Sequence, residues 1–461
     1  MSRLALFSQP DSVPTSWLQR LIQPLQRAGY RWHGGIQLEG YKSLSNGSCI
    51  QRVSPTTGTL LSIPLGNGRH QATPCVNIGQ QVRKGEVIAR GQGHAPWVHA
   101  STSGQVVALQ SAYVADLQSA VPAITIAADG RDEWMDDQPL LPPQSAEALA
   151  QLSWEKGIVG LGGAGFPTGI KISGARHPDM LLINGAECEP FITCDDRLMR
   201  ERASEIIRAA DYLAQTLSIT QIRVGVEPDK SEAMFALKKA ISEANSTTQV
   251  VCLPHRYPAG GQPMLIKSLS GRNLLPGMLP SEIGVMVLNV ATLYKLGQAV
   301  FHQEPLVSRI VTLTGHVGNP GNVEVPIGMP VADLLKQASL REDHTGIHVG
   351  GPMMGRLLSH ESAVISKTSS CLIARSVELF PRRPEPSSCI RCNRCTDACP
   401  IGLQPLKLYE ANQREDKKTL QQEQLTACIE CGACSEVCPS HLPLRDSFRD
   451  AKQMMSRSVA P

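Results

Sequence analysis

Eight of the 14 cysteines lie near the end of the chain, where they form two copies of one spacing pattern. In each copy, two residues separate each cysteine of a triplet from the next, and three residues separate the last of them from a fourth cysteine, which is followed directly by proline. Three thiolates at this spacing can bind three irons of a cubane cluster, whereas the fourth cysteine binds the other cluster in two-cluster ferredoxins. The first array is Cys389, Cys392, Cys395 and Cys399, and the second is Cys428, Cys431, Cys434 and Cys438.

The pattern therefore predicts two [4Fe–4S] clusters that exchange their fourth ligands. Cys438 is expected to complete the cluster on the first triplet, and Cys399 the cluster on the second. Structural zinc is the competing interpretation, but zinc sites usually combine two Cys-x2-Cys pairs across a long gap. The segment between the arrays, residues 405–425, is expected to form a helix that begins at a proline and lies outside the cluster core.

A glycine-rich segment, Gly160-Leu161-Gly162-Gly163-Ala164-Gly165, contains a formal G-x-G-x-x-G pattern. Glycines let backbone N–H groups approach a phosphate closely, and Lys171 nearby adds a positive charge. The dinucleotide fingerprint requires a strand directly before the loop, and only the short Gly157-Ile158-Val159 precedes it here. A tight glycine turn without a ligand is therefore the alternative.

Two carboxylates follow an apolar strand that is expected at residues 180–183. They lie in the motif Asn184-Gly-Ala-Glu187-Cys-Glu189-Pro190. In α/β folds, ligand sites form at the carboxyl ends of strands, so Glu187 and Glu189 are candidate site residues. The alternative is an acidic pair on the surface.

The elements around these motifs indicate several domains. Residues 48–128 show short β-like runs separated by Gly and Pro, typical of a small β-sandwich or barrel similar to the biotinyl/lipoyl hammerhead but without its modifiable lysine. Residues 145–300 alternate helical and apolar strand patterns, which predicts an α/β domain with a largely parallel sheet. In this region helices are expected at 145–154, 196–216 and 230–244, and strands at 180–183, 222–226, 250–253 and 285–288. Residues 305–375 indicate a small α+β unit, and a helix is expected at residues 15–28.

Composition excludes some classes of function. The chain has 461 residues with 44 basic and 41 acidic side chains, a net charge of +3, which argues against nucleic acid or an anionic membrane as the main partner. No apolar run approaches the ~18 residues of a membrane span. The start offers only a short apolar run, so a soluble, unexported chain is expected.

The motifs together resemble the FMN- and NADH-binding subunit of respiratory complex I. They resemble still more closely the family of C subunits of Rnf (Rsx) electron transport complexes, over essentially the whole chain and in the same domain order. The segments that resemble this family are Trp32-His-Gly-Gly-Ile-Gln37, Ser45-Asn-Gly47, Gly162 to Thr168, Asn184 to Leu198, Tyr257-Pro-Ala-Gly-Gly261 and the two cysteine arrays.

The resemblance implies a multidomain fold. It has a β-rich barrel-sandwich domain over residues 1–138 and a Rossmann-like FMN/NADH-binding α/β domain over 145–304. A β-grasp domain of the soluble-ligand-binding type over 305–375 and an α-helical two-[4Fe–4S] ferredoxin-type domain over 380–461 follow.

The resemblance also implies non-covalent FMN with NADH stacked on it. Glu187 and Glu189, the expected catalytic pair, would face the flavin–nicotinamide region together with Asn184, and Phe166 would line the nucleotide entry. The phosphates would be surrounded by Gly160, Gly162, Gly163, Gly165 and Lys171, and the flavin would be contacted by Asn289 and Thr292.

A flavin converts between the two electrons of a hydride and the single electrons of iron–sulfur clusters. The sequence therefore indicates the peripheral NADH/FMN subunit of an ion-translocating oxidoreductase at the cytoplasmic side of the bacterial inner membrane. Its expected partners are separate membrane subunits and a soluble ferredoxin. One alternative is a soluble flavin/iron–sulfur reductase such as a cobalamin reductase, although that family begins near the glycine loop. The other is an adaptor without nucleotide binding, because Leu161 and Leu288 replace an Arg and an Asn of the complex I relative.

Overall fold

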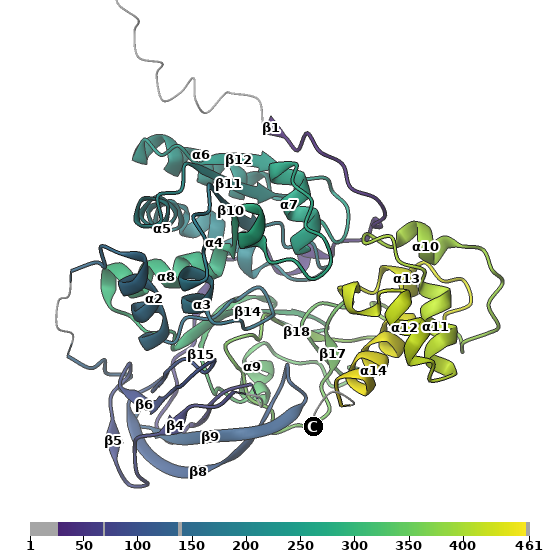
Figure 1. Ribbon diagram of the computed structural model, residues 1–461. Coiled ribbons are helices and arrows are strands. Elements are labelled where there is room, and N and C mark those ends of the chain that lie inside the picture. The colour runs from purple at the N-terminus through teal and green to yellow at the C-terminus, as the bar shows by residue number, and fades with distance from the viewer. Residues whose placement is uncertain (1–25, 68–69, 137–140, 458–461) are drawn as a thin grey trace, which may run out of the picture.

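The computed structural model describes residues 26–67, 70–136 and 141–457 (Figure 1). Most of the helix expected at residues 15–28 lies outside the described residues, and its last part is wrong. Gln26–Arg27 form strand β1, which pairs in parallel with β12 at the edge of the central sheet. Backbone hydrogen bonding to an available sheet edge overrides the local helical periodicity here.

Within the described residues, the central sheet has five strands in the order β1-β12-β11-β10-β13, and neighbouring strands run parallel. Its strands read as continuous apolar runs because both faces of the sheet are covered. The four strands expected between residues 180 and 288 all lie at their expected places. The other bounds are β10 (Met180–Gly185), β11 (Gln221–Val226), β12 (Gln249–Cys252) and β13 (Val285–Asn289).

Helices pack on both faces of this sheet, as the upper part of Figure 1 shows. Leu181 and Ile183 of β10 belong to the apolar core shared with α5 and α8, whereas Met180 and Leu182 pack with α7, because alternate strand residues face opposite sides. The helices are α2 (Ala146–Glu155), α3 (Thr168–Ser173), α4 (Cys194–Glu201), α5 (Ala203–Thr216), α6 (Ser231–Ala244), α7 (Gln262–Ser270) and α8 (Val290–His302).

The single helix expected at residues 196–216 is wrong, because it is divided into α4 and α5. Arg202 leaves the helical region with φ −129° and separates the two helices. The end of α4 is fixed from outside, since Glu201 accepts a hydrogen bond of 2.9 Å from the backbone N–H of Ile50. No Gly or Pro marks this break in the sequence.

The β-rich N-terminal part contains a four-stranded sheet, β3-β9-β8-β5, and a three-stranded sheet, β4-β6-β7. Neighbouring strands in both sheets run antiparallel. The strands are β3 (Leu60–Pro64), β4 (Thr73–Pro74), β5 (Gln81–Val82), β6 (Val87–Arg90), β7 (Val98–His99), β8 (Gly104–Val114) and β9 (Ser119–Ala128).

A third sheet has six strands in the order β17-β16-β18-β14-β15-β2. Its strand β2 (Gln51–Arg52) comes from the N-terminal part and pairs in parallel with β15. The early residues thus contribute strands to two sheets that are otherwise built from later residues. The remaining elements are β14 (Ser308–Gly315), β15 (Gly321–Pro326), α9 (Val331–Gln337), β16 (Ile347–Val349), β17 (Arg356–Leu357) and β18 (Cys371–Ala374).

The C-terminal part is helical and contains both cysteine arrays (yellow in Figure 1). The single helix expected at residues 405–425 is wrong, because α11 and α12 are separated at residues 414–416. Asp416 caps the second helix by accepting from the N–H of Thr419, and Glu415 has φ +53°. The helices are α10 (Arg394–Ala398), α11 (Pro405–Gln413), α12 (Lys417–Gln422), α13 (Ala433–Glu436) and α14 (Leu444–Arg457). Within the described ranges, none of the helices has the length and apolar character that a membrane crossing requires.

Candidate functional site

The glycine loop lies between α2 and α3, with no regular strand directly before it. The loop closes on itself, because the N–H of Gly160 donates to the carbonyl oxygen of Phe166 at 2.8 Å and the N–H of Gly165 to that of Gly160 at 3.1 Å. Gly163 has φ +105°, and a Cβ added there would meet no heavy atom within 4 Å. The loop therefore differs from the strand–loop–helix fingerprint but leaves open space beside Gly163.

The first turn of α8 holds this loop in place. Thr292 Oγ1 accepts from the N–H of Leu161 at 2.8 Å, and a Cβ added at Gly162 would lie 3.4 Å from Cβ of Asn289. Asn289 caps α8, since its side-chain oxygen accepts from the N–H groups of Ala291 and Thr292. The structure therefore brings the glycine loop together with Asn289 and Thr292.

Three further candidates surround this corner of the sheet. Asn184 is the β10 partner of Asn289 in β13, at the carboxyl ends of both strands, and its amide donates to Gly260 O at 2.9 Å. Lys171 on α3 donates weakly to Val287 O at 3.4 Å. Phe166 is 41% exposed at the end of the glycine loop.

Lys171 has the surroundings expected of a side chain that binds an anion. Burial alone lowers the pKa of its ammonium group, and no salt bridge neutralises it among the residues that the structure describes. A phosphomonoester near the glycine loop would supply the missing negative charge. The buried ammonium of Lys171 and the open space beside Gly163 are compatible with a phosphate group, and their role in holding the phosphate of FMN stays a prediction.

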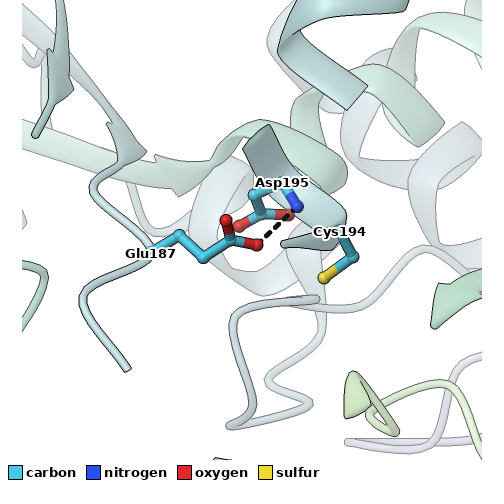
Figure 2. Close-up of side chains that lie close together, drawn as sticks. All are labelled: Glu187, Cys194 and Asp195. Atoms are coloured by element: carbon cyan, nitrogen blue, oxygen red, sulfur yellow. Dashed lines mark hydrogen bonds between the residues drawn. The ribbon is translucent and has the colours of Figure 1, made fainter. Parts of the chain in front are cut away.

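Glu187 caps helix α4 (Figure 2). Its carboxylate accepts from the N–H of Asp195 at 2.6 Å and from that of Asp196 at 3.2 Å, where the helix dipole favours a negative charge. Burial nevertheless raises the pKa of the Glu187 carboxyl, with the charge of Lys42 opposing this shift. A carboxylate oxygen of Glu187, the Sγ atom of Cys194 and a carboxylate oxygen of Asp195 lie within 4.8 Å of one another.

Glu189 joins the α/β part to the third sheet. Its carboxylate accepts from the N–H groups of Met353 and Met354, both at 3.0 Å. Burial raises its pKa to about 7, and these two N–H groups act in the opposite direction. Each carboxylate thus accepts two hydrogen bonds from backbone N–H groups, so the interpretation of the pair as a solvated surface feature is wrong. Whether they act on NADH stays a prediction.

The Met353–Met354 turn also contacts the helical part that holds the cysteines. Arg445 on α14 donates to Met353 O, and Arg449 donates to Met354 O at 2.7 Å. The turn is therefore held between the loop of residues 187–193, called the acidic loop below, on one side and α14 on the other.

The two arrays differ in burial. Cys399, Cys431 and Cys434 are at most 9% exposed, whereas Cys389 and Cys392 are exposed. A cavity is lined by the three thiol-bearing residues of the second triplet together with Cys399. Burial raises the pKa of the thiols of Cys428, Cys431 and Cys434, and the charge of a Cys399 thiolate acts in the same direction.

These neighbours agree with exchanged fourth ligands, since Cys438 is likewise an electrostatic neighbour of Cys395. Backbone N–H groups point at three sulfur atoms, with donors at Arg391 and Leu403 at 3.3 Å and at Glu430 at 3.4 Å. Thiolates that accept such hydrogen bonds are a suitable donor set for iron–sulfur clusters. The ligand assignment itself stays a prediction.

Sequence reasoning missed two residues of this region. Asp195 accepts from the Asn289 amide at 2.5 Å, and Lys42 Nζ donates to the backbone of the acidic loop. Asp195 lies five residues after the acidic motif, within the segment Asn184 to Leu198 that carries the resemblance, so its charge was a usable signal. Lys42 is 145 residues from Glu187 in sequence, and no spacing pattern connects them.

Four family profiles match the chain. Residues 30–131 match "RnfC Barrel sandwich hybrid domain", residues 154–298 "Nuo51 FMN-binding domain", residues 310–357 "SLBB domain" and residues 388–442 "4Fe-4S dicluster domain". The order supports a multidomain layout. FMN and two [4Fe–4S] clusters are accordingly the cofactors of this chain.

The chain is also similar to curated and solved proteins. It is 40% identical over 430 residues to the C subunit of the ion-translocating oxidoreductase complex of Haemophilus influenzae (strain 86-028NP), covering 91% of this chain and 64% of the relative. The corresponding protein of Pasteurella multocida (strain Pm70) is 41% identical over 429 residues, covering 91% and 51%. A solved NAD+-reducing [NiFe]-hydrogenase is similar with 18% identity and a TM-score of 0.49, covering 69% of this chain and 64% of that one.

The chain spans about half to two thirds of the length of these curated relatives. The identity extends over nearly the whole chain and includes the barrel-sandwich, FMN-binding and dicluster regions. Over nine tenths of its length, the chain is therefore similar to the C subunits of ion-translocating oxidoreductase complexes.

Proposed function

We propose that this chain is the NADH- and FMN-handling iron–sulfur subunit of an Rnf-type ion-translocating oxidoreductase. The supporting observation is a set of contacts that joins the α/β part, with its glycine loop and acidic motif, to the helical part that contains the buried cysteine array. Tyr257 Oη donates to Cys431 O at 2.7 Å, and the Met353–Met354 turn bridges Glu189 and α14. A flavin site in direct contact with a cluster domain suits the transfer of electrons between them.

In this proposal the glycine loop and Lys171 hold the FMN phosphate, and Asn184, Asn289 and Thr292 lie against the flavin. Glu187 and Glu189 orient the nicotinamide, and Phe166 borders the entry of the dinucleotide. When bound, FMN takes up a hydride and releases its electrons singly, which no amino-acid side chain does. Gly160, Gly162, Gly163 and Gly165 supply backbone N–H groups and close approach.

The difference in burial between the two arrays suggests an order for the relay. The array containing Cys431 lies against the α/β part, and the array containing Cys389 and Cys392 reaches the surface. The buried cluster would therefore exchange electrons with the flavin, and the exposed cluster with a partner. That partner is another subunit of the complex or a soluble ferredoxin.

We assign domains at residues 1–138, 145–304, 305–375 and 380–461, with a Rossmann-like second domain and a β-grasp third domain. The chain would attach to the cytoplasmic side of the inner membrane through its partner subunits.

The test is anaerobic reduction of the purified, cluster-loaded chain by NADH, followed at flavin and cluster wavelengths. The proposal expects bleaching of the flavin and then of the clusters. FMN that NADH cannot reduce would favour an adaptor without nucleotide chemistry. NADH reduction without association with membrane subunits in a pull-down would favour a soluble reductase.

A further inference from the structure

Lys42 directs its side chain at a single loop of the α/β part. Its Nζ donates to the backbone carbonyl oxygens of Glu187 at 2.6 Å, Glu189 at 2.7 Å and Ile192 at 2.6 Å. A lysine ammonium has three N–H donors, so all three are used on this loop. The three oxygens are drawn toward one point, which leaves the side chains of Glu187 and Glu189 free to reach α4 and the Met353–Met354 turn.

The residues next to Lys42 fasten the same loop. The N–H of Phe191 donates to Gly40 O at 2.8 Å, and the rings of Tyr41 and Phe191 stack with centroids 4.5 Å apart and an angle of 6°. Ser45 Oγ lies 2.8 Å from Thr193 Oγ1. Residues 40–45 therefore form a clamp on residues 187–193.

The clamped loop holds an unfavourable backbone conformation. Glu187 has φ +44° and Phe191 has φ +69°, although neither is glycine. Such residues persist only where the surroundings over-determine them, and they concentrate at functional sites. The hydrogen bonds from Lys42 begin at the first of these two residues and end just beyond the second.

The charge of Lys42 reaches four carboxyls in and near the loop. Burial raises the pKa of Glu187, Glu189, Asp195 and Glu227, and the charge of Lys42 opposes that shift at all four. Three other cations oppose the same shift at some of these groups. Lys230 acts on Glu187, Asp195 and Glu227, Arg309 acts on Asp195, and Arg445 acts on Glu189.

We propose that Lys42 is a positioning residue for the flavin reaction, which fixes the loop of Glu187 and Glu189 and supplies the positive charge behind it. This inference rests on the proposed function for the role of the two carboxylates. It gives Lys42, which lies outside the α/β part, a role in the electrostatics of the site.

The test compares the flavin potential of three variants of the full, cluster-loaded chain: Lys42→Met, Lys42→Gln and Lys42→Arg. The potential is measured by dithionite titration between pH 6 and 9, after FMN content has been determined by acid release. Single-turnover reduction by NADH is measured separately. Lys84→Met is the matched control, because Lys84 is a buried lysine that pairs with Asp132 at 2.6 Å in the β-rich N-terminal part.

Lys42→Met and Lys42→Gln are expected to make the flavin potential more negative, because a positive charge favours the electron-rich reduced flavin. In both variants, the pH at which the flavin potential changes is expected to rise, since Glu187 and Glu189 lose the positive charge that opposes their protonation. Reduction by NADH is expected to slow at least tenfold. Lys42→Arg should keep the wild-type potential but only part of the rate, because the N–H donors of its planar guanidinium are spread over three nitrogen atoms and do not radiate from one atom as those of Lys42 do. Lys84→Met should leave the potential unchanged.

Two outcomes would overturn the proposal. One is a Lys42→Met or Lys42→Gln chain that retains FMN with an unchanged potential, pH profile and rate. The other is loss of FMN from all three variants, Lys42→Arg included, which would make Lys42 a residue required for folding only. Because the titration uses dithionite, a wild-type chain that NADH cannot reduce would count against the proposed function and not against the effect of Lys42 on the potential.

Discussion

The phenol of Tyr257 donates a hydrogen bond of 2.7 Å to the backbone carbonyl oxygen of Cys431, and both residues are buried. The contact joins the segment after β12 to the second cysteine array. Cys188, from the acidic motif, packs in the same apolar cluster as Tyr257 and Cys431. The array that holds the buried cluster is therefore fixed against the α/β part of the chain and not only within the helical part.

Removing this hydroxyl should loosen the array. In Tyr257→Phe, the buried carbonyl group of Cys431 loses its partner, which should cost about 1–3 kcal/mol. The melting temperature of the cluster-loaded chain should fall, and the EPR signal of the buried cluster should broaden. Tyr113→Phe is the control, because the hydroxyl of Tyr113 contacts Ser359 at an exposed site. An equal effect of both changes would show that the Tyr257 contact has no special role.

The glycine loop allows a sharp test of flavin binding. Gly163→Val should abolish the flavin absorbance and leave the cluster absorbance intact. Valine is β-branched and disfavours φ +105°, and its side chain would occupy the open space beside the loop. FMN released by acid is the measurement.

Gly79→Val is the matched control for this change. Gly79 also has a positive φ, +91°, with no atom within 4 Å of an added Cβ, but it lies before β5 in the β-rich part. Backbone strain there should leave FMN content unchanged. Equal FMN content in wild type and Gly163→Val would remove the assignment of this loop to the phosphate.

Local spacing made some of these features predictable and left others out of reach. The cysteine arrays, the glycine loop and strands β10 to β13 of the central sheet depend on residues near one another in sequence, so pattern and periodicity indicated them. Strand β1 was expected to be helical, because its pairing partner β12 lies more than 200 residues away. The breaks at Arg202 and at Glu415 depend on tertiary contacts and on a cap at Asp416, and the expected helices ran through both. Lys42 and Met353 reach the acidic loop from segments more than 140 residues away, and nothing in one sequence connects them.

The two carboxylates should affect NADH reduction without being required for FMN binding. In the double variant Glu187→Gln and Glu189→Gln, an amide NH2 group replaces one acceptor oxygen at each site, opposite a backbone N–H. Stopped-flow bleaching by NADH should become slower while FMN content is retained. Unchanged bleaching would restrict both residues to their structural contacts with α4 and with the Met353–Met354 turn.

The carboxyl of Glu189 should also contribute to the pH dependence of the free energy of unfolding. Its pKa is raised to about 7 in the folded chain, above the ~4.3 of a free glutamate, so the folded state binds the extra proton. The stabilisation is fully present below ~4.3 and is lost as pH rises through 7. A difference of one between the folded and unfolded pKa corresponds to about 1.4 kcal/mol. Between pH 5 and 8, the melting temperature of wild type should therefore fall relative to Glu189→Gln, and parallel curves would contradict the buried carboxyl.

The exchange of ligands between the arrays predicts an asymmetric result for one cysteine. In Cys399→Ser, the cluster on Cys428, Cys431 and Cys434 should change, because Cys399 lies beside these thiols in one cavity. The cluster on the first triplet should keep its full set of ligands, since Cys438 and not Cys399 completes it. Low-temperature EPR of the reduced protein distinguishes the two clusters.

The controls are one change in each triplet, Cys392→Ser and Cys431→Ser, and the reciprocal change Cys438→Ser. Cys399→Ser should share its altered signal with Cys431→Ser, and Cys438→Ser should share its signal with Cys392→Ser. The opposite pairing would mean that each array binds its own cluster. In that case the closeness of Cys399 to the second triplet would reflect packing alone, and the separate helices α11 and α12 would connect two independent cluster sites.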